Sequence, residues 1–173
     1  MFTVSYTGHR PKDLIGYKAD YTLILRQIKL HLKSIFDQHP NETFTVISGG
    51  AQGVDQLAFQ AAHILKKEGY NICNTVAVPF KGQEERWPEL TRFGQKEYRD
   101  MLTKADHIEI LSDNNENAIA KLDERNHWMV DHSDLLICVT PYENILTRPG
   151  GTGNCLRYAA KKHHPYTICS ITL

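Results

Sequence analysis

The sequence has no excess of charge of either sign. Its 173 residues include 20 Lys and Arg and 20 Asp and Glu, which give a formal net charge of zero at pH 7. A protein that binds nucleic acid or an anionic membrane through its overall charge needs a cationic excess. The composition therefore disfavours both classes of function, although a local basic patch is compatible with it.

Long apolar runs are also missing. No stretch of about 18 apolar residues, the length needed to cross a bilayer, occurs in the chain. The N-terminal sequence MFTVSYTGHR has neither the basic leader nor the apolar core of a secretory signal. We therefore expect a cytoplasmic protein without a membrane partner.

Cysteine pairs and histidine clusters of the kind that bind metals are absent as well. None of Cys73, Cys138, Cys155 and Cys169 forms a C-x-x-C pair, and three of them lie in or beside β-rich runs. This pattern predicts reduced, buried thiols without disulfides. Cys155 precedes a helical segment and either has a lowered pKa or packs in the core, and packing is favoured because no base accompanies it. The nine histidines lack the H-x-x-x-H pattern with a carboxylate that a catalytic zinc needs, so we expect no metal.

Strand-like and helix-like segments alternate along the chain, and 41% of its residues are hydrophobic. Short β-branched runs predict strands at residues 2–6, 44–47, 73–78, 107–111, 135–139 and 166–171. Apolar residues at helical spacing predict helices at 21–36, 54–65, 90–105, 119–130 and 156–160. The alternation predicts an α/β protein, a three-layer Rossmann-like sandwich with a mostly parallel sheet. The length suits one compact domain over residues 1–173.

Two glycine-rich turns, at residues 48–55 and 149–154, each lie between a predicted strand and a predicted helix. Glycine allows close approach of the backbone, and the start of the following helix attracts an anion. Each turn alone is equally typical of a tight connection, but two together favour a phosphate cradle. Neither matches G-x-G-x-x-G or the P-loop pattern. We therefore expect a nucleotide-like small molecule as the ligand, but not a standard dinucleotide or ATP site, and no cofactor.

Loops that follow parallel strands meet at one edge of the sheet. The turns at 7–11, 48–55, 79–87 and 150–154 are therefore expected to form one pocket, with the polar segment 79–88 as an exposed loop or lid. The predicted ligand-binding residues are Thr7, Gly8, His9, Arg10, Ser48, Gly49, Gly50, Gln52, Gly53, Asp55, Pro79, Phe80, Glu84, Trp87, Arg125, Asn126, Asp134, Gly150, Gly151, Thr152, Gly153 and Asn154.

Several of these side chains have two interpretations. Arg125 is either a two-point clamp on a phosphate or carboxylate or a solvated partner of its acidic neighbours. Asp134 either faces the ligand or caps the strand that it begins. Trp87 and Phe80 are suited to stack on a base, although a place in the core is as compatible with Phe80.

The order of these motifs resembles a known family. Thr7-Gly8-His9-Arg10-Pro11, the turn at 48–55, Arg125-Asn126 and Gly150-Gly151-Thr152-Gly153 together resemble YpsA-type members of the SLOG superfamily. This Rossmann-like group includes the Lonely Guy phosphoribohydrolases, the DprA core and ligand-sensing domains of bacterial defence systems. The resemblance covers nearly the whole chain and implies binding of a nucleotide-derived ligand.

The chain departs from the pattern of the Lonely Guy enzymes, which cleave a base from a nucleoside monophosphate. Arg125 stands where those enzymes have an arginine, but Arg157 stands where their P-G-G-x-G-T-x-x-E motif has its glutamate, and Asn154 replaces the motif's threonine. A guanidinium cannot act as a carboxylate in acid–base chemistry, so that reaction is disfavoured. An arginine at position 157 is still compatible with holding an anion.

Three hypotheses follow from the resemblance and this departure. The favoured one is a module that binds a nucleotide-derived molecule, such as an ADP-ribose-like signal, for sensing or sequestration, and a homo-oligomer is compatible with it. The second is a nucleoside-phosphate N-glycosidic hydrolase that uses a relocated carboxylate. The third is a DprA-like single-strand DNA binder, which the absence of a cationic excess disfavours. The candidate carboxylates of the second hypothesis are Asp55, Glu84, Glu85 and Asp134.

Overall fold

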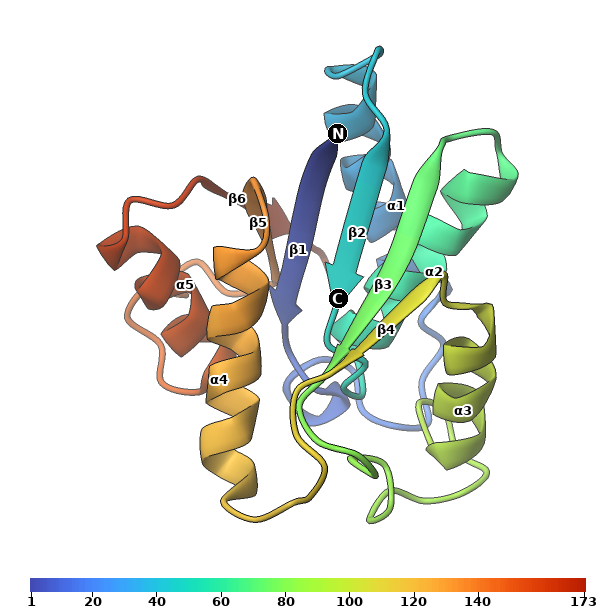
Figure 1. Ribbon diagram of the computed structural model, residues 1–173, viewed down its shortest axis with the longest axis vertical. Coiled ribbons are helices and arrows are strands. Elements are labelled where there is room, and N and C mark those ends of the chain that lie inside the picture. Colours follow the sequence, from blue (N-terminus) through green and yellow to red (C-terminus); the bar gives the residue numbers. More distant parts are fainter.

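A computed structural model describes all 173 residues and contains one sheet of six parallel strands. The strands are β1 (Phe2–Gly8), β2 (Phe44–Ser48), β3 (Ile72–Val78), β4 (His107–Ile110), β5 (Leu135–Thr140) and β6 (Tyr166–Ser170). Their order across the sheet is β4-β3-β2-β1-β5-β6 (Figure 1). The predicted α/β class is confirmed, and every strand pair is parallel.

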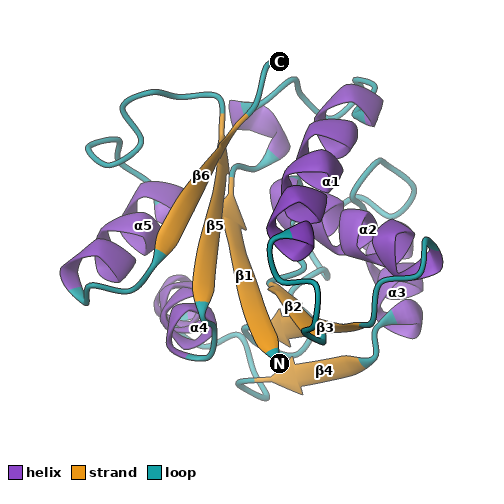
Figure 2. Cartoon of the chain, turned by 90° about the horizontal axis from the view of Figure 1, so that it is seen from above, coloured by secondary structure: helices purple, strands orange, loops and turns teal.

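The helices cover both faces of the sheet. Helices α1 (Thr22–Asp37), α2 (Val54–Lys67) and α3 (Gln95–Lys104) lie on one face, and α4 (Ala118–Asp131) and α5 (Gly151–Lys161) lie on the other (Figure 2). The Rossmann-like three-layer arrangement is therefore confirmed. The chain winds outward from β1 to β4 and then returns to β5 beside β1. The strand order thus reverses between β1 and β5, the position where sheets of this type open a crevice for ligands.

The larger part of the core lies between the sheet and α1 and α2. Ile24, Ile28, Leu32 and Ile35 recur at helical spacing along α1 and are buried, as the sequence period predicts. A smaller cluster on the opposite face joins β5 to α5. Complete burial of one such Leu or Ile side chain stabilises the fold by about 1.5–3 kcal/mol. The two helical layers therefore fix the sheet, and the sheet fixes where its loops begin.

The segment before α3 differs from the prediction. Helix α3 begins at Gln95, whereas the spacing of Leu90 and Phe93 suggested a helix from residue 90. Phe93 is fully buried but has a φ of 62°, and Leu90 is 80% exposed, so both belong to an irregular turn. The apolar spacing was right about the burial of Phe93 and wrong about its conformation.

Two further expectations need correction. The loop at 79–88 is not wholly exposed, because Phe80 and Gln83 are both buried. Cys138, Cys155 and Cys169 are free and buried, as expected, but Cys73 is exposed.

None of the five helices has the length and apolar character that crossing a bilayer requires.

Candidate functional site

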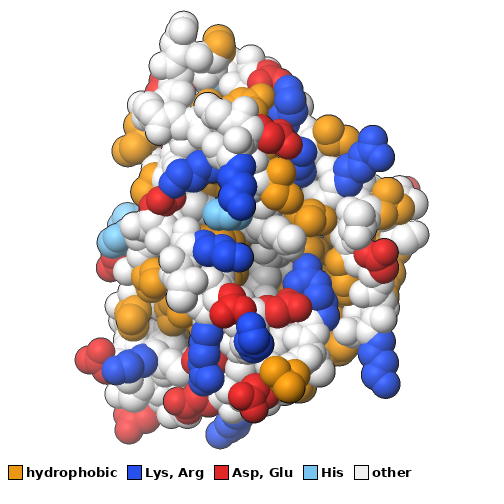
Figure 3. Space-filling model, turned by 90° about the vertical axis from the view of Figure 1, so that its right-hand side faces the viewer, with side chains coloured by type: hydrophobic (Ala, Val, Ile, Leu, Met, Phe, Trp, Pro, Cys, Tyr) orange, Lys and Arg blue, Asp and Glu red, His pale blue; other side chains and the backbone are white.

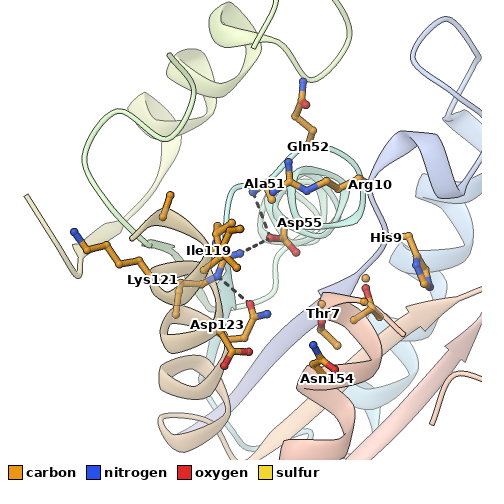
Figure 4. A pocket seen from close by; sticks show the side chains of 18 of the residues that line it. Thr7, His9, Arg10, Ala51, Gln52, Asp55, Ile119, Lys121, Asp123 and Asn154 are labelled. Atoms are coloured by element: carbon orange, nitrogen blue, oxygen red, sulfur yellow. Dashed lines mark hydrogen bonds and ion pairs between the residues drawn. The ribbon is translucent and has the colours of Figure 1, made fainter. Parts of the chain in front are cut away.

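A cavity of about 1290 Å³ opens at the carboxyl edge of the sheet. The loops after β1, β2 and β5 line it together with the first half of α4 (Figure 4). The residues that were predicted from the sequence and line this pocket are Thr7, Gly8, His9, Arg10, Gln52, Asp55, Arg125, Asn126, Gly150, Gly151, Thr152 and Asn154. Parallel topology thus brings segments far apart in the sequence to one place.

Other predicted residues lie outside the pocket lining: Ser48, Gly49, Gly50, Gly53, Pro79, Phe80, Glu84, Trp87, Asp134 and Gly153. Asp134 lies at the opposite, amino edge of the sheet, where its Oδ2 accepts a hydrogen bond of 2.8 Å from the backbone amide of Thr3. The capping interpretation of Asp134 is therefore the correct one, because a side chain at the start of a parallel strand cannot reach the carboxyl edge.

The loop at 79–87 contributes less to the pocket than expected. Trp87 packs edge-on against Tyr98, with ring centroids 5.3 Å apart, and so belongs to the core under α3. Glu84 forms an ion pair of 3.3 Å with Arg99. Of this loop only Arg86 lines the pocket. The expectation that Trp87 and Phe80 stack on a ligand is not supported by these positions.

The first glycine turn is filled by protein side chains. Arg125 reaches it from α4, is only 4% exposed, and donates from Nη1 to the carbonyl of Gly49 at 2.6 Å. Gln83 Nε2 donates to the same carbonyl at 3.1 Å. A Cβ on Gly49 would lie 2.1 Å from Nη1 of Arg125, so only glycine fits there. The interpretation of Arg125 as a solvated surface residue is wrong, and its Nη1 already bonds a protein carbonyl.

Asp55 is the third side chain that occupies this turn, beside Arg125 and Gln83. Its Oδ2 accepts from the amide of Ala51 at 3.3 Å and lies 3.8 Å from Nη2 of Arg125. Burial raises the pKa of Asp55, and the charge of Arg125 opposes that rise. The carbonyl of His9 accepts from the amide of Val54, the first residue of α2. The start of α2 therefore already has a carboxylate and a carbonyl beside it.

The second glycine turn is open. Gly150 precedes α5 with a φ of 112°, a conformation that favours glycine. No side chain caps α5, its first turn has no acidic residue, and the amides of Gly151, Thr152 and Gly153 have no acceptor. The hydroxyl of Thr152 has no partner either, although this residue is only 8% exposed. Of these residues Gly151 and Thr152 lie at the pocket wall, as does the positive end of the helix dipole, whereas Gly153 does not line the pocket.

Basic side chains line the pocket onto which this turn opens. Arg148, which the sequence analysis missed, lies over the ring of Tyr142 with its guanidinium carbon 3.6 Å from the ring centroid. Arg10 and Lys12 line the pocket as well. The sequence could have indicated Arg148 as a pocket residue, because it is a basic residue directly before the glycine turn that begins at Pro149-Gly150. The pocket residues outside the predicted set are Lys12, Asp13, Ala51, Arg86, residues 117–124, Arg148 and Pro149.

Arg157 supports the open turn from outside the pocket. Its Nη1 donates to the carbonyls of Leu146 and Arg148, each at 2.9 Å, and its Nη2 donates to Oδ1 of Asn154. The expectation that Arg157 holds an anionic ligand is not supported, because these bonds fix the backbone that leads into α5. Cys155 is fully buried, and burial raises its pKa to about 11, so it packs in the core as favoured.

His9 connects the two sides of the pocket. Its Nε2 lies 2.8 Å from Oγ1 of Thr140 at the end of β5, and its ring packs edge-on against Tyr142. The hydroxyl of Tyr142 donates to the carbonyl of Asp13 at 2.6 Å. Burial lowers the pKa of His9, which favours a neutral imidazole at neutral pH. The loops after β1 and β5 are thus joined at the point where the strand order reverses.

The fold and these loops define a Rossmann-like α/β protein with one polar pocket at its switch point. A model of the YpsA family, described as the YspA SLOG family, matches residues 4–173. The chain belongs to this family, which confirms the resemblance found in its motifs.

Relatives in bacilli agree with this assignment. The chain is 35% identical over 130 residues to the "Uncharacterized SPbeta prophage-derived protein YoqJ" of Bacillus subtilis, covering 69% of this chain and 71% of the relative. It is 26% identical over 178 residues to a UPF0398 protein of Bacillus velezensis, covering 100% and 92%. It is also 26% identical over 140 residues to the UPF0398 protein YpsA of Bacillus subtilis, covering 79% and 74%.

Proposed function

We propose that the protein binds a nucleotide-derived small molecule through its phosphate, for sensing or sequestration. The observation that carries this proposal is the uncapped start of α5, where Gly151 and Thr152 line the pocket and their amides have no acceptor. An anion there accepts hydrogen bonds from the backbone and is stabilised by the helix dipole. Arg148, two residues before Gly150, lines the pocket as well, and the unpaired hydroxyl of Thr152 adds a donor.

The distribution of carboxylates supports binding rather than hydrolysis. Of the four candidates for a relocated catalytic carboxylate, only Asp55 lines the pocket, and it is paired with Arg125. Arg157, at the position of the glutamate in Lonely Guy enzymes, bonds backbone carbonyls. Of those four candidates Asp55 alone remains, and it already has a structural role; Asp13, Asp123 and Glu124 also line the pocket.

The surface charge supports a small ligand rather than DNA. The face of the molecule seen in Figure 3 carries Lys and Arg side chains interspersed with Asp and Glu. Single-stranded DNA is held by a continuous basic groove with aromatic side chains on which bases stack. The aromatic candidate of the pocket loops, Trp87, packs against Tyr98 instead.

Thermal unfolding with added ligands tests the proposal. Nucleoside 5′-monophosphates at about 100 times their Kd should stabilise the fold by about 2.7 kcal/mol. For a chain of this length that raises the Tm by roughly 5–10 °C. The corresponding nucleosides should raise it much less, because they lack the anion. Equal shifts from nucleotides and nucleosides would contradict the assignment of the phosphate.

A matched pair of variants locates the anion. Arg148→Met should lower the affinity for the monophosphates about tenfold or more, because it removes one charge-assisted contact. Arg26→Met replaces an exposed arginine on α1, far from the pocket lining, and should leave the affinity unchanged. Unchanged affinity in both variants would contradict the proposed position of the anion at the start of α5. Mass spectrometry of molecules that co-purify with the protein would identify the natural ligand.

A further inference from the structure

Asp55 presents an unused hydrogen-bond acceptor to the pocket. All contacts of its carboxylate run through Oδ2, which faces Ala51 and Arg125. Oδ1 has no partner, although the residue is only 6% exposed and lines the cavity. Figure 4 shows the carboxylate between Ala51 and Arg10 on one side and Thr7 and Asn154 on the other. Oδ1 is accessible from the pocket and accepts no hydrogen bond from the protein, so this oxygen is free to accept one from a ligand group.

The charges around Asp55 restrict what that group can be. A phosphate oxygen is a hydrogen-bond acceptor like Oδ1, so it cannot bond this oxygen. A cation is disfavoured because Arg125 and Arg10 both act on Asp55 from close by. What remains is a neutral donor, a hydroxyl or an N–H group, which bonds a carboxylate strongly.

Asp55 and the proposed anion position face the same pocket. Asp55 follows β2, the open turn follows β5, and β1 lies between these two strands. Asp55 lines this cavity together with Gly151 and Thr152 at the start of α5. A pentose 5-phosphate that occupies the cavity can therefore contact Asp55 with its sugar and the start of α5 with its phosphate.

We propose that Asp55 determines specificity for a ribose, with Oδ1 accepting hydrogen bonds from the vicinal 2- and 3-hydroxyls while the 5-phosphate lies at the start of α5. The ligand is then a ribose 5-phosphate derivative rather than a deoxyribose derivative. This inference rests on the proposed function and adds the sugar to it. Asp55 acts here by recognition, and no bond of the ligand is broken.

Isothermal titration with matched sugars tests the inference without any variant. The probes are ribose 5-phosphate and the 5′-monophosphates of adenosine, guanosine, cytidine and uridine, each paired with its 2-deoxy or 2′-deoxy counterpart. Every ribose compound that binds should bind about tenfold or more tightly than its deoxy partner, the effect of one hydrogen bond to a charged group. Equal affinities within the pairs that bind would overturn the role of Asp55 alone. If none of these compounds binds, the proposed function itself fails.

Variants test the contact with the sugar and the contact with the phosphate separately. Asp55→Asn should reduce the ratio of ribose to deoxyribose affinity several-fold, because a neutral acceptor forms a weaker bond. Asp134→Asn is the same substitution at the opposite edge of the sheet and should leave the ratio unchanged. Arg148→Met should weaken both members of a pair equally. A ratio that is unaltered in Asp55→Asn would contradict the inference, and if that variant does not fold, the comparison of sugars on the unaltered protein decides.

Discussion

The two glycine turns look alike in the sequence and differ in the structure. Both follow a strand, precede a helix and lie at the carboxyl edge of the sheet. The turn at 48–55 is filled by Arg125, Gln83 and the carboxylate of Asp55. The turn at 149–154 leaves the first amides of α5 free and directly follows Arg148, which lines the pocket. A glycine-rich turn is therefore an anion site only when the rest of the protein leaves its donors unused.

The difference has a local and a distant cause. Locally, Asp55 lies in the first turn of α2 and brings a negative charge to the helix start, whereas the first turn of α5 has no acidic residue. The distant cause is Arg125, which bonds Gly49 across 76 positions of sequence. Only the local cause can be read from the motif itself.

The largest expected effect is the difference in stability between replacing Arg125, which occupies the first turn, and replacing Arg148, which precedes the second. Arg125→Met should lower the free energy of unfolding by about 3–5 kcal/mol, because it leaves the carboxylate of Asp55 buried without its partner. Arg148→Met should lower it by about 1 kcal/mol or less, the value of its contact with the ring of Tyr142. Urea denaturation of both variants measures the difference. Similar losses in the two variants would show that the first turn has no special structural role.

The glycines provide a second, smaller comparison. Gly49→Ala should destabilise the fold by about 1–3 kcal/mol, because its Cβ would clash with Nη1 of Arg125. Gly151→Ala should change stability by about 0.5 kcal/mol or less, because a Cβ there meets no atom within 4 Å. Thermal or urea unfolding of the two proteins checks this. A stable Gly49→Ala variant would mean that Arg125 can move without loss.

His9 contacts the start of α2 and the loop after β5, and its titration gives a third test. Burial lowers its pKa in the folded state, so the unfolded chain binds the proton more readily. Stability should therefore fall as the pH decreases through the unfolded value of about 6.5. His9→Gln should have a shallower dependence on pH between 8 and 5, as measured by urea midpoints.

Comparison with the variant isolates His9 from other titrating groups. The raised pKa of Asp55 acts in the opposite direction, since its contribution is present at low pH and lost as the pH rises. His31 is also buried and has a lowered pKa. Both contributions are common to the two proteins and cancel in the difference. Parallel pH profiles would show that the ring of His9 is not held in its neutral form.

The smallest expected effect is an absence of catalysis. Incubated with nucleoside monophosphates for hours, the protein should release no free base at an enzyme-like rate, because Arg157 replaces the carboxylate of the resembled hydrolases. Loss of such a group removes several kcal/mol of transition-state stabilisation. Chromatography of the products measures this. Accumulation of base that Asp55→Asn abolishes would establish a relocated carboxylate and refute the binding-only function.

Much of the fold and part of the pocket could be predicted because they depend on local patterns. The period of Ile28 and Leu32 in α1 and the alternation of elements determine the layers. The parallel topology then brings the loops after β1, β2 and β5 together. Sequence patterns did not reveal that Phe93 sits in a turn with positive φ, since its apolar character is equally compatible with a helix. Nor did they reveal the distant partners that remove Trp87 and Asp134 from the pocket.

The hydrogen bond between His9 and Thr140 also bears on how the protein folds. It joins residues separated by 131 positions, so the pocket depends on contacts between segments far apart in the chain. Contacts of such long sequence separation form slowly, because a large loop must close before any interaction compensates for the lost entropy. The strands from β1 to β4 precede β5 in the chain, and the open turn lies beyond β5. Because the pocket needs these long-range contacts, we expect binding competence to appear late in refolding, and ligand binding measured during refolding would test this.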